Sequence, residues 1–193
     1  MAPFDIVLVP AMSDNYVYLA HDPETGVTAV VDPSEAEPVE AALDAQGWKL
    51  THILNTHHHL DHTGGNARLA KRFGAILIGP KSETTRIANM DLTVVEGDTI
   101  DVGGHKGVVF ETPGHTMGHI AFWFADSDAL FSGDTLFALG CGRVFEGTME
   151  QMWDSMLKMR SVPTTARIYC GHEYTLSNAK FALSVDPDNA RLQ

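Results

Sequence analysis

Short runs of alternating apolar and polar residues fill the first third of the chain. Three of them, at residues 4–9, 16–21 and 27–32, are separated by turn-forming segments rich in Asp, Asn, Pro and Gly. Alternation with a period of two is typical of β-strands that bury one face. These runs therefore predict an antiparallel meander of three strands.

A helical pattern follows the meander. Val39 and Leu43 lie four residues apart on the apolar side of a segment that ends at Gln46. Ser34 is placed to cap the first turn of this helix, and Gly47 is placed to end it. We therefore expect a helix that is capped by Ser34 and runs through Gln46.

Strands and helices alternate along the rest of the chain. The pattern predicts a polar loop at 56–64 and helices at 66–73, 150–159 and 175–185. It predicts strands at 51–55, 75–78, 106–111, 120–124, 129–131 and 168–170. This order favours the α/β class, in which helices cover sheets so that both apolar faces are buried.

Size and charge narrow the possible functions. A chain of 193 residues with 44% hydrophobic residues can build one substantial core but is short for two, so we expect one domain over 1–193. The formal net charge of -12 would repel phosphate backbones and anionic lipid headgroups. We therefore expect neither nucleic acid nor membrane as a partner, and favour a small-molecule substrate.

The start of the chain and its cysteines bear on location. Met1 leads directly into a strand-like run that contains Asp5, without the basic start and long apolar stretch of a signal peptide. Cys141 and Cys170 are the only cysteines, so a disulfide framework is not expected. We predict a cytoplasmic monomer.

The segment from His57 to His62 has the spacing of a metal site. It reads H-x-H-x-D-H and lies after a predicted strand. Because alternate residues of an extended segment point the same way, His57 and His59 can face one metal ion. Asp61 and His62 follow where the chain turns, so they can reach a second ion close by.

Three further donors follow predicted strands at distant points of the chain. They are His115 in TPGHT, Asp134 in SGDT and His172 in CGHE. Loops at strand ends commonly carry the functional residues of α/β proteins. A carboxylate such as that of Asp134 can bridge two cations, and a set of imidazoles and carboxylates suits zinc, iron or manganese.

The other histidines have less specific surroundings. We expect His21, His52 and His105 to be surface residues or hydrogen-bonded core residues. His58 should point away from its neighbours by strand alternation, so we expect it, and less clearly His119, to support the ligands rather than bind a metal.

Several separated motifs together resemble one family. In chain order they are DNY at 14–16, THHHLDH at 56–62, TPGHT at 112–116, SGDTLF at 132–137, GCGR at 140–143, FEGT at 145–148 and CGHEYT at 170–175. The histidine-rich loop resembles the metallo-β-lactamase superfamily. GCGR, FEGT and CGHEYT resemble, within it, the glyoxalase II family, the hydroxyacylglutathione hydrolases.

This resemblance implies a fold and a metal-ligand set. The fold would be the αβ/βα four-layer sandwich of the superfamily. The first of two divalent ions, most readily zinc, would bind His57, His59 and His115. The second would bind Asp61, His62 and His172, and Asp134 would bridge the two.

The resemblance also implies a reaction. It is hydrolysis of the thioester S-D-lactoylglutathione to D-lactate and glutathione by a hydroxide shared between the two ions, with Asp61 and Asp134 as the catalytic carboxylates. Arg143, Phe145 and Tyr174 match positions that resemble substrate contacts, and Phe145 stands where some relatives carry a Tyr hydroxyl.

Members of the family usually continue into a small helical domain, whereas this sequence stops at Gln193. We therefore expect either a shortened chain or a short enzyme of altered specificity. Two alternatives stay open: an enzyme like persulfide dioxygenase with one iron ion, and a metal-binding domain that acts on another substrate.

Overall fold

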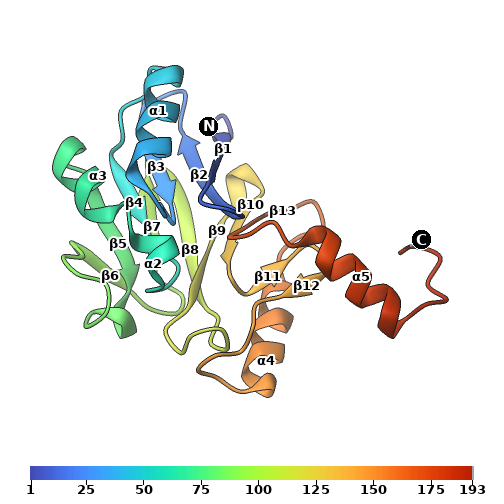
Figure 1. Ribbon diagram of the computed structural model, residues 1–193. Helices are drawn as coiled ribbons and strands as arrows, with labels where there is room; N and C mark the ends of the chain where they lie inside the picture. Colours follow the sequence, from blue (N-terminus) through green and yellow to red (C-terminus); the bar gives the residue numbers. More distant parts are fainter. Residues whose placement is uncertain (193) are drawn as a thin grey trace.

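Two β-sheets form the centre of the molecule (Figure 1). The computed structural model describes residues 1–192, so Gln193 lies outside the described residues. The first sheet has the order β1 (Asp5–Ala11), β2 (Asn15–His21), β3 (Thr28–Val31), β4 (His52–Leu54), β5 (Ile76–Pro80) and β6 (Leu92–Val94). The second has the order β13 (Arg167–Cys170), β10 (Ala129–Gly133), β9 (Ile120–Phe124), β8 (His105–Glu111) and β7 (Thr99–Val102).

The strand pairing follows the hydrophobic pattern. β1, β2 and β3 pair antiparallel, which confirms the predicted meander, and β3 to β6 pair parallel. The strands β7 to β10 pair antiparallel in the second sheet, and β13 adds to β10 in parallel. The remaining elements are α1 (Ala36–Gln46), α2 (Leu60–Thr63), α3 (Asn66–Phe73), η1 (Lys81–Glu83), η2 (Ala125–Ser127), β11 (Leu136–Phe137), β12 (Gly140–Cys141), α4 (Met149–Met159) and α5 (Thr175–Val185).

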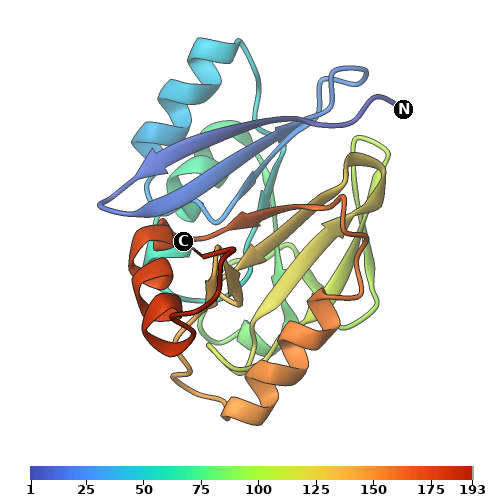
Figure 2. The ribbon, with the colours of Figure 1, turned by 90° about the vertical axis from the view of Figure 1, so that its right-hand side faces the viewer.

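Three apolar cores separate four layers. The largest lies between the two sheets and includes Tyr18, Phe122 and Phe131. Alternate residues on the other face of the first sheet, such as Leu19, pack against α1 and α3, and α4 covers the outer face of the second sheet through Met159 (Figure 2). This arrangement is the four-layer α/β sandwich that the motifs imply.

Most helix and strand bounds agree with the pattern, and α3, β9 and α5 agree to the residue. The predicted cap of α1 is wrong: the helix begins at Ala36, Glu35 holds the cap position, and no side chain caps it. Ser34 lies one residue too early and is buried, with its carbonyl against Gly64. Gly47 does end α1, in the left-handed conformation with φ 69°.

The hydrophobic pattern did not predict the shortest elements. The structure places α2 inside the predicted 56–64 loop, and β6, β7, β11 and β12 were not predicted. Each of these has two to four residues, which is too few for a periodicity to show. The turn of α2 brings His62 back toward the residues that precede it.

Candidate metal centre

All seven predicted metal ligands lie at one edge of the two sheets. His57 follows β4, His115 follows β8, Asp134 follows β10 and His172 follows β13. These strands end at the same edge, so residues far apart in the sequence meet there, and the 57–62 segment supplies the remaining donors.

Three imidazole nitrogens converge in the first group of donors. His59 Nδ1 lies 3.0 Å from His57 Nε2 and 3.0 Å from His115 Nε2. Donors bound at 2.0–2.1 Å to a tetrahedral zinc ion are about 3.3 Å apart, so these separations fit a cation held among the three nitrogens. The donor set therefore suits a divalent metal.

A second group of donors lies beside the first. His62 Nε2 is 3.2 Å from His172 Nε2, and Asp61 Oδ2 is 3.4 Å from the same His172 atom and 3.6 Å from His62 Nε2. One carboxylate and two imidazoles facing a common point again form a set of metal-ligand type.

The Asp134 carboxylate lies between the two groups. Its Oδ2 is 3.3 Å from His115 Nε2 and 3.3 Å from His172 Nε2, and its Oδ1 is 3.5 Å from His62 Nε2. Oδ1 is buried and has no hydrogen-bond partner within residues 1–192. A buried carboxylate oxygen without a partner is costly, and a cation beside it would remove that cost.

Hydrogen bonds fix which imidazole nitrogen faces the site. Three ring nitrogens on the far side of the rings contact oxygen atoms: His115 Nδ1 with Arg143 O at 2.8 Å, His172 Nδ1 with Asp14 Oδ1 at 2.8 Å, and His62 Nδ1 with Asp32 Oδ2 at 3.1 Å. Because these nitrogens donate their protons outward, it is the Nε2 atom of each ring that points into the site. Metal-binding histidines are usually oriented in this way.

The first group of imidazoles is held neutral. Burial lowers the pKa of His57 well below its ordinary value, lowers the pKa of His59 to about 4, and lowers the pKa of His115. A metal ion competes with protons for these nitrogens, so neutral imidazoles are ready to bind it.

The second group has the opposite electrostatics. Burial alone would lower the pKa of His62 and His172, but nearby carboxylates outweigh burial: Asp134 and Asp32 raise the pKa of His62, and Asp134 and Asp61 raise that of His172 to about 10. The hydrogen bond from His172 in turn lowers the pKa of Asp61. Carboxylates that favour a proton here also favour a metal cation.

The structure adds Asp32 to the site, which sequence reasoning missed. It follows β3, is buried, and accepts hydrogen bonds from Thr56 N at 2.8 Å and Thr56 Oγ1 at 2.6 Å as well as contacting His62. Its backbone has φ 50°, a conformation that Asp tolerates better than most residues. The only feature of the sequence that could have indicated Asp32 is the Asp-Pro pair at the end of a predicted strand. Such pairs are common in turns, so the pair does not by itself predict a functional residue.

Two other supporting contacts bind the donors in place. Asn15 Nδ2 donates to Asp61 Oδ2 at 3.1 Å. His119 is fully buried, burial lowers its pKa to about 3, and its Nε2 accepts the backbone N–H of Asp134 at 3.0 Å. His119 therefore supports a donor and does not face the site itself.

A glycine makes room for the closest donors. A Cβ at Gly171 would lie 2.4 Å from Asp134 Oδ1 and 2.7 Å from His62 Cε1. Any other residue there would displace Asp134 and His62, which explains the glycine between Cys170 and His172.

The donors open into a cavity of about 950 Å³. The three predicted substrate residues line it. Tyr174 stacks on His172 with ring centroids 5.1 Å apart, the Phe145 ring lies 5.2 Å from that of His115, and the Arg143 guanidinium lies 5.6 Å from the Phe145 ring. Residues for which the sequence indicated no substrate role complete the wall: Phe137, Cys141, Gly142, Ser177 and Asn178.

The remaining histidines lie outside the donor groups. His58 Nδ1 is 3.3 Å from the buried Glu83 carboxylate. His21 contacts Thr28 and stacks on Trp48, and His52 contacts Thr51. His105 is fully buried at the opposite end of β8, beside Asp126.

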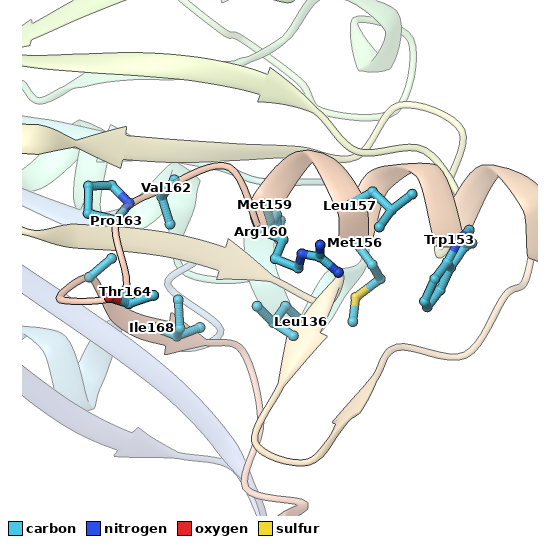
Figure 3. Close-up of a pocket in the computed structure, with 11 residues that line it drawn as sticks. Leu136, Trp153, Met156, Leu157, Met159, Arg160, Val162, Pro163, Thr164 and Ile168 are labelled. Carbon is cyan, nitrogen blue, oxygen red and sulfur yellow. The ribbon is translucent and has the colours of Figure 1, made fainter.

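A second cavity of about 370 Å³ lies along α4 (Figure 3). Its wall is mainly apolar, with Trp153, Met156, Leu157 and Ile168, and Arg160 is its one charged residue within the described chain. None of the predicted metal or substrate residues lines it.

The chain is similar to known proteins of one superfamily. The model of the metallo-beta-lactamase superfamily matches residues 12–172. A hydroxyacylglutathione hydrolase of Rhodopseudomonas palustris is 55% identical over 98% of this chain and 74% of its own length.

Solved structures share the fold. The crystal structure of ETHE1 from Myxococcus xanthus has a TM-score of 0.78 and 30% identity, covering 89% of this chain and 76% of that chain. A second, TTHA1623, was solved in a di-iron-bound form and has a TM-score of 0.72 and 25% identity, covering 86% of this chain and 90% of that one. No helix among the described residues is long and apolar enough to span a membrane.

Proposed function

Because the chain belongs to the metallo-beta-lactamase superfamily and, within it, to the hydroxyacylglutathione hydrolases, we propose that it hydrolyses S-D-lactoylglutathione to D-lactate and glutathione. The names of its relatives support the substrate class. The paired donor groups support a reaction that uses two metal ions.

We assign the donors to two sites. His57, His59 and His115 would hold one divalent ion, and Asp61, His62 and His172 the other. Asp134 would serve both, since its two oxygens face both groups. Zinc fits this set of nitrogen and oxygen donors, and iron fits it as well. When bound, such ions lower the pKa of a water molecule and polarise a carbonyl group.

The chain's own residues would orient the reactants. Asp61 and Asp134 would accept hydrogen bonds from the attacking water, since both carboxylates line the cavity. The Arg143 guanidinium would attract a glutathione carboxylate, and Tyr174 would offer a hydroxyl at the cavity wall. Phe145 can contribute apolar contact only. The leaving thiolate is a weak base, so a dedicated acid is less necessary than for amide cleavage.

The observation that carries the proposal is the position of Asp134 between two complete donor groups. The test is to purify the chain, count its metals and follow loss of the thioester absorbance of S-D-lactoylglutathione, with and without a chelator. A long-chain acyl-CoA thioester serves as the control substrate. We expect about two metals per chain and turnover that is specific for the glutathione thioester and lost with the chelator.

The same preparation separates the alternatives. One iron per chain with oxygen consumption would contradict the hydrolase and favour a dioxygenase. Two metals without turnover of the glutathione thioester would favour a domain of another specificity. Cytoplasmic location, a monomeric state and a single domain over 1–193 stay predictions.

A further inference from the structure

One arginine joins three segments that surround the candidate metal centre. Arg86 lies in the loop between β5 and β6. Its Nε is 2.5 Å from the Glu83 carboxylate, and its Nη1 donates to Glu146 Oε1 at 2.5 Å. Arginine can contact two carboxylates at once because its donors form a rigid planar fork.

The first carboxylate reaches the histidine-rich loop. Glu83 is fully buried, its Oε2 is 3.3 Å from His58 Nδ1, and its Oε1 accepts a hydrogen bond from Thr116 Oγ1 at 3.4 Å. His58 lies between the donors His57 and His59, so the Glu83 carboxylate faces the segment that carries both of them.

The second carboxylate reaches the wall of the substrate cavity. Glu146 Oε2 accepts the backbone N–H of Met117 at 2.7 Å. The neighbouring backbone also binds the His115 loop, through Phe145 N to His115 O at 3.3 Å and Gly147 N to Gly114 O at 3.0 Å. Glu146 therefore ties residues 143–147, which carry Arg143 and Phe145, to the loop of a metal ligand.

The strength of this connection depends on burial. The side chains of Arg86 and Glu146 are 36% and 29% exposed, so water screens their pair less than it screens a fully exposed one. The Phe145 ring is 59% exposed, and its aromatic neighbours are His59 and His115. Glu146 therefore adds a side-chain connection to the backbone hydrogen bonds that hold residues 143–147 against the His115 loop.

We propose that Arg86 and Glu146 are positioning residues that hold the substrate wall, residues 143–147, against the histidine-rich loop. The proposal rests on the proposed function, because it predicts that these two residues lower the KM of that reaction. Neither residue touches the reacting atoms, and neither is a metal ligand.

The test compares Glu146→Ala and Arg86→Lys with a matched control. Glu146→Ala removes the carboxylate, and we expect KM for S-D-lactoylglutathione to rise about five- to tenfold with kcat and metal content unchanged. Arg86→Lys keeps the positive charge but loses the planar set of guanidinium donors, so it should give a smaller rise in KM. Lys158→Met on α4, which breaks an ion pair of similar exposure with Glu96, should leave KM unchanged.

The double variant sharpens the result. If Arg86 acts through Glu146, adding Arg86→Lys to Glu146→Ala should raise KM no further. An unchanged KM in Glu146→Ala would overturn the proposal. A fall in kcat that follows metal loss, at constant KM, would also overturn it, because that is the effect of a purely structural residue.

Hydrogen exchange tests the connection without any substrate. In Glu146→Ala the amides of 143–147 should exchange about five- to tenfold faster, while those of 60–66 keep their rates. Equal exchange of 143–147 in both proteins would overturn the proposal. A wild-type protein without turnover contradicts the proposed function alone, and the exchange result then still decides whether Glu146 holds the wall.

Discussion

Two buried clusters of histidine and carboxylate lie at opposite ends of the same strands. β8 begins at His105 and leads at its other end to His115. β2 ends beside Asp22 and begins at Asn15, which contacts the candidate metal centre. The two clusters use the same residue types at similar burial, so neither type nor burial distinguishes them.

The difference lies in what the polar atoms meet. His105 Nδ1 is 2.9 Å from Asp126 Oδ2, the His105 ring packs 3.9 Å from that of Phe4, and Asp22 accepts hydrogen bonds from Thr25 and Glu24. At the candidate metal centre, imidazole nitrogens of different side chains face one another across 3.0–3.2 Å. The structural cluster pairs an imidazole nitrogen with a single carboxylate oxygen, whereas the candidate metal centre brings nitrogen and oxygen atoms of several side chains to a common point.

The largest expected effect comes from replacing one carboxylate at each end. Asp134→Asn removes the negative charge that both donor groups share, so we expect turnover to fall at least about 1,000-fold together with metal content. Asp126→Asn at the other cluster should keep turnover per folded molecule and lower the free energy of unfolding by about 1 kcal/mol. Equal losses of turnover in the two variants would show that the clusters do not differ in kind.

An intermediate effect is expected from replacing one buried aspartate at each cluster, Asp32 at the candidate metal centre and Asp22 at the other cluster. Asp32→Asn weakens the orientation of His62, so metal affinity should fall about 10- to 100-fold, measured by competition with a chromophoric chelator. Asp22→Asn disturbs the hydrogen bonds of a turn and should lower stability while metal affinity stays at the wild-type value. Wild-type metal affinity in Asp32→Asn would contradict the supporting role of Asp32.

The smallest effect concerns pH at the end of the sheet away from the candidate metal centre. Burial lowers the pKa of His52, so the folded state binds its proton less readily than the unfolded state. The unfolded state then takes up more protons as the pH falls below about 6.5, and stability is lost toward the folded pKa.

His52→Gln should remove this contribution. Urea unfolding with chelator present, at pH 7.5 and at pH 5.5, should show a smaller loss of stability in the variant than in the wild type. Identical losses would mean that His52 titrates alike in both states.

The local order of apolar and polar residues determined several helices and strands and one cluster of metal-ligand side chains. Apolar periodicity specified α3, β9 and α5 to the residue, because burial of one face depends only on the spacing of a few neighbours. The H-x-H-x-D-H spacing likewise placed four donors within six residues, where no long-range folding is needed to bring them together.

The tertiary structure decided which distant residues join them. Asp32 contacts His62 across 30 residues, Asn15 contacts Asp61 across 46, and Asp14 contacts His172 across 158. The motifs indicated His115, Asp134 and His172 only as members of a set. No local pattern records such pairs, because strand order and sheet packing, rather than sequence spacing, set which loops meet at the edge of the sheets.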